Sequence, residues 1–133
     1  MNKSEYADLL SRVVSLSQEL DRARRELEEL ETSPTPEPPP VIESFEDYVK
    51  FRDEHDAHRS AIHNARSRVG DLEFKLAAMV QAWRRSLPAN TWFRIPDSDI
   101  YVRLVQVSPQ ARTESDFRFD IVEGRPEQED TGE

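Results

Sequence analysis

Apolar side chains recur three and four residues apart, in strict alternation, through the first quarter of the chain. Eight successive positions fit: Tyr6, Leu9, Val13, Leu16, Leu20, Ala23, Leu27 and Leu30. This spacing is typical of a helix that pairs with another helix along a narrow apolar seam. Asn2 and Glu5 have the spacing of a helix N-cap, so the pattern predicts a coiled-coil helix over residues 1–32.

The same alternation returns further along the chain. Its positions are Tyr48, Phe51, His55, His58, Ile62, Ala65, Val69, Leu72, Leu76, Met79 and Trp83. Ser44 and Asp47 form a second capping pair, and Pro88 ends the helical pattern. A second coiled-coil helix is therefore predicted over residues 44–87, with Trp83 as a core residue.

Residues 33–43 between the two patterns form a proline-rich linker, with prolines at positions 34, 36, 38, 39 and 40. Prolines at this density stop a helix and favour an extended chain. The linker also contains a loose P-x-x-P pattern in Pro36-Glu37-Pro38-Pro39. No basic residue flanks this pattern to orient docking, so we interpret the segment as a stiff connector that lets the helices fold back as an antiparallel hairpin.

The hairpin register can be estimated from the ends nearest the linker. If the chain turns back at once, Leu30 lies near Tyr48 and Tyr6 lies near Leu72. The second helix then extends beyond the first as an overhang from about Glu73 to Ser86, roughly 20 Å long. Extra apolar residues lie off the seam in this stretch, at Phe74, Ala77, Ala78 and Val80. We expect the C-terminal part of the chain to cover them.

Residues 88–122 have the composition of a small β-sheet. Strand patterns cover residues 91–95, 100–107 and 116–122, and Pro96 to Asp99 reads as a tight turn. Residues 123–133 carry a net charge of −4 and are predicted to be a disordered acidic tail. The expected fold is mainly α with a small β part: a helical hairpin followed by a three-stranded antiparallel meander.

Composition limits the classes of function. The net charge of −9 disfavours direct nucleic-acid binding, because phosphate contacts require clustered Lys and Arg. No cysteine is present, so disulfides and thiolate metal sites are excluded. No run of apolar residues is long enough to span a membrane. We expect an acidic cytoplasmic protein that uses neither membrane nor cofactor.

The three histidines are the best candidates for chemistry. His55 and His58 share a helix face on the seam, whereas His63 points elsewhere. We interpret the pair as a polar layer that fixes the helix register. Two alternatives are a pH-responsive weak point and a metal or catalytic site, for which His55 and His58 are weak metal candidates. Because nucleophile motifs and glycine-rich loops are missing, no catalytic residue is predicted.

The abundance of helix-pairing surface favours a non-catalytic adaptor or scaffold for protein–protein interaction or self-assembly. Its partner would be another protein or a second copy in a homo-oligomer. The alternative is a small acidic inhibitor or regulator that docks on a basic, for example nucleic-acid-binding, surface of its partner. Apolar seam residues and arginine–aromatic combinations are the interface candidates. These are Leu9, Val13, Leu16, Leu20, Leu27, Leu30, Arg84, Arg85 and Trp92.

Overall fold

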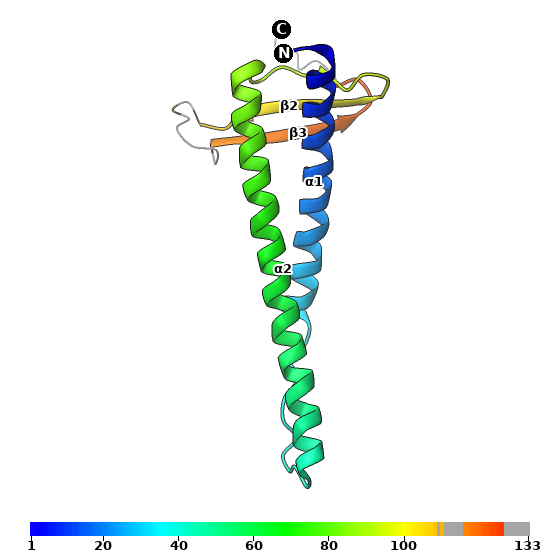
Figure 1. The fold of residues 1–133 in the computed structure, drawn as a ribbon, viewed down its shortest axis with the longest axis vertical. Helices are drawn as coiled ribbons and strands as arrows, with labels where there is room; N and C mark the ends of the chain where they lie inside the picture. Colours follow the sequence, from blue (N-terminus) through cyan, green and yellow to red (C-terminus); the bar gives the residue numbers. More distant parts are fainter. Residues whose placement is uncertain (109, 111–115, 127–133) are drawn as a thin grey trace. The chain divides into compact units, whose positions relative to one another are not determined.

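The computed structural model describes residues 1–108, 110 and 116–126. Two long packed helices form a hairpin, and a three-stranded antiparallel sheet follows them (Figure 1). The predicted α+β class and order of elements are confirmed. The elements are α1 (Lys3–Thr32), α2 (Phe45–Ser86), β1 (Phe93–Arg94), β2 (Ile100–Gln106) and β3 (Phe117–Glu123).

Both helices begin at the predicted caps. The Oδ1 atom of Asn2 accepts a hydrogen bond from the backbone N–H of Glu5 at 2.8 Å. Ser44 Oγ accepts from the N–H of Asp47 at 3.1 Å. These side chains satisfy N–H groups that have no partner within the first helical turn. The caps therefore fix both helix starts locally.

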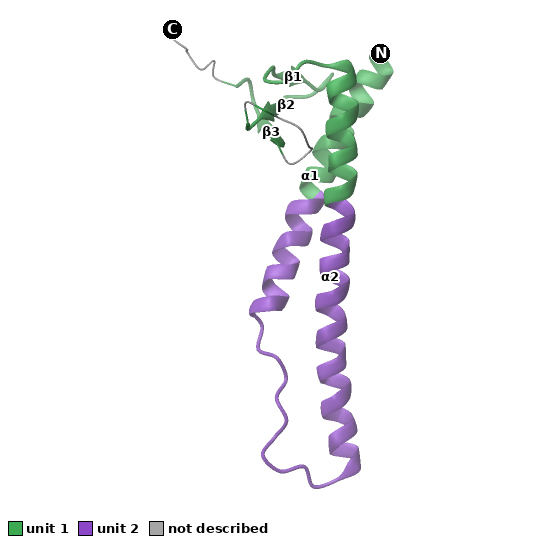
Figure 2. Ribbon diagram, turned by 90° about the vertical axis from the view of Figure 1, so that its left-hand side faces the viewer, with its two compact units in different colours: residues 1–18, 73–133 green, residues 19–72 purple. Residues whose placement is uncertain are grey.

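The chain divides into two compact units, shown in Figure 2. Unit 1 contains Met1–Gln18 and Glu73–Glu133, and unit 2 contains Glu19–Leu72. Unit 1 thus combines the start of α1, the end of α2 and the sheet. Unit 2 holds the end of α1, the linker and most of α2.

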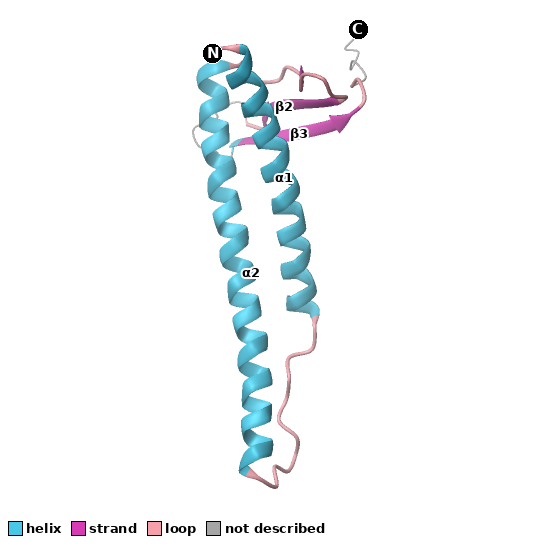
Figure 3. Ribbon diagram, turned by 45° about the vertical axis from the view of Figure 1, so that its right-hand side comes forward, coloured by secondary structure: helices cyan, strands magenta, loops and turns pink. Residues whose placement is uncertain are grey.

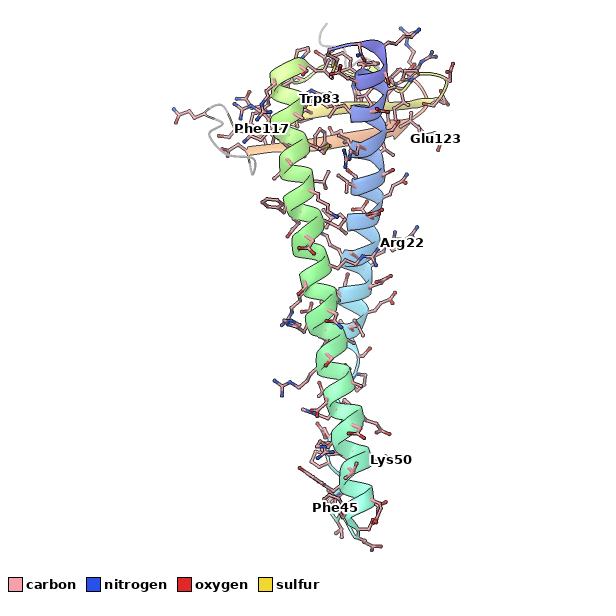
Figure 4. The ribbon with its side chains drawn as sticks, viewed as in Figure 1. Arg22, Phe45, Lys50, Trp83, Phe117 and Glu123 are labelled. Atoms are coloured by element: carbon pink, nitrogen blue, oxygen red, sulfur yellow. The ribbon has the colours of Figure 1, made fainter. Side chains whose placement is uncertain are left out.

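In unit 1 the sheet packs against the helix pair as a third layer, and the core contains residues of both helices and the sheet. The sheet has the order β1-β2-β3, with Val102 of β2 opposite Phe93 on one side and Ile121 on the other. Val102 and Leu104 are fully buried, as is Trp83 of α2. Figure 4 shows Trp83 on α2 and Phe117 at the start of β3. The prediction that Trp83 is a core residue is confirmed.

The first turns of α1 bury more than the predicted seam. Leu10 and Val14 lie off the heptad positions, yet Leu10 is fully buried and Val14 is 7% exposed. Both belong to the same core cluster as Val102 and Leu104. With Leu9 and Val13 they make a wide apolar stripe, which suits a helix that packs against more than one neighbour.

Polar groups fix the corner between α2 and the sheet. Trp83 Nε1 donates to the carbonyl of Pro88 at 3.0 Å. Asn90 adopts a left-handed φ of 63° and donates its N–H to Leu104 O at 2.7 Å. Its Oδ1 atom accepts from the N–H of Gln106 at 3.3 Å. Asn90 thereby hydrogen bonds to β2 beyond the two-residue strand β1.

In unit 2 the predicted helix register is wrong. That register places Glu31 near Asp47, but the Glu31 carboxylate accepts from Arg66 Nη2 at 2.8 Å. The helices have slid by roughly three heptads, a change that keeps seam facing seam because the repeat is periodic. The core of unit 1 selects the observed register, since it brings residues 9–14 of α1 together with Val80 and Trp83.

The overhang is consequently at the other end of α2, over residues 45–65 (Figures 2 and 3). This stretch is about 31 Å long at ~1.5 Å per residue. The twelve residues 33–44 between α1 and α2 reach about 37 Å when extended at ~3.1 Å each. They are therefore long enough to span the overhang. The predicted acidic tail, 123–133, lies outside the described residues from position 127 onward.

Candidate interaction surfaces

The overhang of α2, residues 45–65, is the first candidate surface. Phe51, His55, His58 and Ile62 of its seam are half-buried, while Tyr48 is 43% exposed. Phe45, at the start of the helix in Figure 4, is 72% exposed. Within residues 33–43 of the linker every side chain is exposed except Pro36, which is half-buried. A continuous heptad seam is therefore present here without a second helix from α1.

Charge divides this part of the chain into two blocks. Residues 43–56 contain six acids and two bases, a net charge of −4. Residues 57–70 contain three arginines and no acid, a net charge of +3. A binding partner for the acidic block should carry basic flanks, and one for the basic block should carry acidic flanks.

The histidines lie where the seam places them. His55 Nδ1 is 3.7 Å from Asp56 Oδ1, and the His55 ring is 5.8 Å from the ring of Phe51. His63 lines an open polar hollow on one side of α2, together with Asp56, Arg59, Ser60 and Asn64. Among the described residues, no group of three or more His, Cys, Asp or Glu side chains is placed to hold a metal ion. The interpretation of His55 and His58 as a polar layer stays a prediction.

The predicted interface residues on the seam of α1 fall into two groups. Leu9, Val13 and Leu20 are at most 8% exposed, so in this fold they have almost no surface to offer another protein. These three side chains are already buried within the folded chain. The other three, Leu16, Leu27 and Leu30, are half-buried.

The predicted arginine–aromatic candidates belong to unit 1. The Arg84 guanidinium lies 4.6 Å from the centroid of the Phe117 ring, at an open hollow that Leu87 also lines. Arg85 is exposed, and Trp92 is half-buried. Arg84 and Trp92 therefore already make contacts within the chain.

The outer face of the sheet carries a cluster that sequence analysis did not single out. Arg103 places its guanidinium 4.4 Å from the centroid of the Trp92 ring and donates to Asp120 Oδ2 at 2.8 Å. Arg118 donates from Nε to the other carboxylate oxygen at 3.2 Å. The sequence indicated that Arg118 and Asp120 share one face of a strand, because they alternate with Phe117, Phe119 and Ile121. The pairing of Asp120 with Arg103 could not be predicted, since it depends on strand register.

Tyr6 joins α1 to the sheet within unit 1. Its hydroxyl donates to the carbonyl of Arg94 at 3.1 Å, and its ring packs edge-on against Phe93 at 6.0 Å. Burial raises the pKa of the Tyr6 hydroxyl, and the nearby charge of Arg94 opposes that rise. Tyr6 therefore links α1 to β1 through one hydrogen bond and one ring contact.

The helices in the described part of the chain are too polar or too short in apolar runs to cross a membrane. Comparison of the chain with protein-family models, with curated proteins and with solved structures finds no match.

Proposed function

We propose that this chain is a non-catalytic adaptor or scaffold protein that binds a helix along the overhang of α2. The observation that carries the proposal is the seam of residues 45–65, which continues the heptad repeat beyond the end of α1 and remains half-exposed. Apolar seams of this kind bind helices with a matching repeat. We further propose a cytoplasmic location, with which the absence of cysteine is compatible.

The overhang offers both binding energy and selectivity. Phe51 and Ile62 are apolar anchors that a bound helix would bury further, at about 25 cal/mol for each Å² removed from water. The acidic and basic blocks on its flanks would favour a helix of one orientation and disfavour the reverse. These features suit an adaptor, since they recognise shape and charge without any reacting group.

A second candidate function is that of an acidic regulator which docks on a basic surface of its partner. The net charge of −4 over residues 43–56 favours it. Such a complex would depend on charge, so it should weaken sharply when salt shortens the range of electrostatic attraction. A complex held by a partner helix in the apolar seam should persist at high salt.

The experiment is co-purification of the tagged full-length chain from its native cell at ~0.1 M and ~1 M salt. The test variant is Phe51→Glu/Ile62→Glu, which puts two charges into the seam. A matched control, Ala57→Glu/Ser67→Glu, adds the same charges at exposed positions off the seam.

The adaptor proposal expects a near-stoichiometric protein, or a second copy of the chain, that survives high salt and is lost only in the seam variant. Loss at high salt in the wild type would favour the acidic regulator. Equal binding by the seam variant and its control would contradict the adaptor role of the overhang. Circular dichroism of each variant checks that α2 remains helical.

A further inference from the structure

We propose that the occupant of the overhang is a second copy of this chain, bound antiparallel through residues 45–68 of both α2 helices. This inference deepens the proposed function and rests on it. It concerns unit 2 alone, and four features of that unit support it: length, seam register, charge and the exposure of the linker.

The length of the overhang matches a second overhang. α1 ends at Thr32, and its last turn lies near Arg66 of α2. An antiparallel copy that pairs residue 48 with residue 65 would begin its own α2 opposite residue 68. The first turn of the incoming helix would therefore lie beside the last turn of α1, near Arg66, and the rest would extend the helix pair to the beginning of α2. Each copy would complete the other along ~31 Å of helix.

The seam is self-complementary in that register. The layers become Tyr48 with Ala65, Phe51 with Ile62 and His55 with His58, each occurring twice by symmetry. A large ring faces a small residue in the outer layer, and polar rings face polar rings at the centre. A slide of one heptad in either direction would set His55 against Phe51 or against Ala65. Matched polar layers of this type fix register and orientation in coiled coils.

Charge favours the same arrangement. The acidic block of one copy, residues 43–56, lies beside the basic block of the other, residues 57–70. Exposed Asp47 is placed next to exposed Arg68 of the second copy on the flank of the seam. Arg52 and Arg59 are like charges that approach one another, but Arg52 has Asp53 at 3.7 Å on its own helix. A parallel pair would instead place the two acidic blocks against each other and the two basic blocks against each other.

The linker passes beside the overhang on the side of α2 where α1 lies (Figures 2 and 3), so a partner on the seam would pack over it. Its side chains from 33 to 43 are exposed apart from half-buried Pro36, so they form no core with α2. Val41 is 70% exposed and Ile42 is 37% exposed. An incoming helix would bury these two residues and the seam in one interface, while the stiff linker stays at its side.

The first test is sedimentation velocity of the full-length chain over about 1–200 µM, a range that spans ordinary dimer affinities. We expect a monomer–dimer equilibrium that Phe51→Glu/Ile62→Glu abolishes and Ala57→Glu/Ser67→Glu leaves in place. A wild-type chain that remains monomeric throughout would overturn the inference. If the seam variant nevertheless loses a captured partner, the adaptor function stands and only its occupant was misassigned.

Cysteine cross-linking tests orientation, because the chain contains no cysteine of its own. Tyr48→Cys and Ala65→Cys are prepared as separate proteins and then mixed under oxidising conditions. In the antiparallel register a disulfide joins the two different variants, whereas identical cysteines are ~26 Å apart. Disulfides between two copies of the same variant, with none between the two different variants after mixing, would indicate a parallel pair and overturn the inference.

A charge swap tests register. Asp47→Arg and Arg68→Asp should each weaken the dimer about tenfold, because each change turns two attractive contacts repulsive. The double variant should return to near wild-type affinity, since the charges are only exchanged. Additive loss in the double variant would show that these residues do not face each other.

Discussion

One heptad repeat runs through both units, but its positions are buried to very different extents. In unit 1, Val13 and Trp83 are fully buried. In unit 2, Leu20, Ala23 and Leu72 are also buried, but Leu27 and Ile62 remain half-buried. The difference is a third layer: the sheet covers the helix pair in unit 1. Two helices alone bury a narrow stripe, and a wide core requires a third partner. The overhang has neither the second helix nor the sheet.

The largest effect is expected at the centre of unit 1. Trp83→Ala should lower the free energy of unfolding by about 3–5 kcal/mol, because it leaves a cavity and removes the hydrogen bond to Pro88. Urea denaturation at fixed protein concentration measures it. Phe74→Ala, at a side chain that is 78% exposed, is the control and should change stability by less than about 0.5 kcal/mol.

A second pair of variants compares the two units directly. Leu10→Ala should cost about 2–4 kcal/mol, because Leu10 is fully buried beneath the sheet. Leu27→Ala removes the same atoms from a heptad position in unit 2 and should cost about 1 kcal/mol, since that side chain is already part-exposed. Equal losses would show that the sheet adds nothing to the burial of the helix pair.

The sequence predicted the seam residues well and the register poorly, and both results have the same cause. A heptad repeat identifies which face of each helix is buried, but a slide by whole heptads leaves that face unchanged. Only non-periodic contacts distinguish the registers. Leu10 and Val14 were the available signal, because two extra apolar residues so early in α1 required a neighbour other than α2.

The surfaces were less predictable than the helices. Cross-strand pairs such as Arg103 with Asp120 depend on strand register, which alternating patterns leave open by steps of two residues. The overhang likewise follows from the helix register, so its location could not be deduced before the core of unit 1 was known. The interpretation of His55 and His58 as a polar layer stays a prediction, and in the observed register α1 ends before it reaches them.

A smaller effect is expected on the outer face of the sheet. Asp120→Asn should cost about 1–2 kcal/mol, because it leaves Arg103 without its carboxylate while the Arg103 side chain is only 23% exposed. Thermal denaturation monitors the change. Asp53→Asn removes a carboxylate that is 68% exposed and should have almost no effect. Similar losses from both variants would mean that the sheet cluster is no more stabilising than a surface pair.

The smallest effect is a pH dependence at Tyr6. Burial raises its pKa above the ordinary value of 10.0, so the folded chain holds the phenol proton more tightly than the unfolded chain does. The resulting stabilisation is fully present below about pH 10 and is lost as the pH rises through the folded-state pKa. Tyr6→Phe should cost about 1 kcal/mol at pH 8, where it removes the hydrogen bond to Arg94. Because phenylalanine does not titrate, the two stabilities should converge above about pH 10. A difference between them that stays constant from pH 8 to 11 would show that the Tyr6 hydroxyl ionises equally well in both states, and would contradict the expected pH dependence.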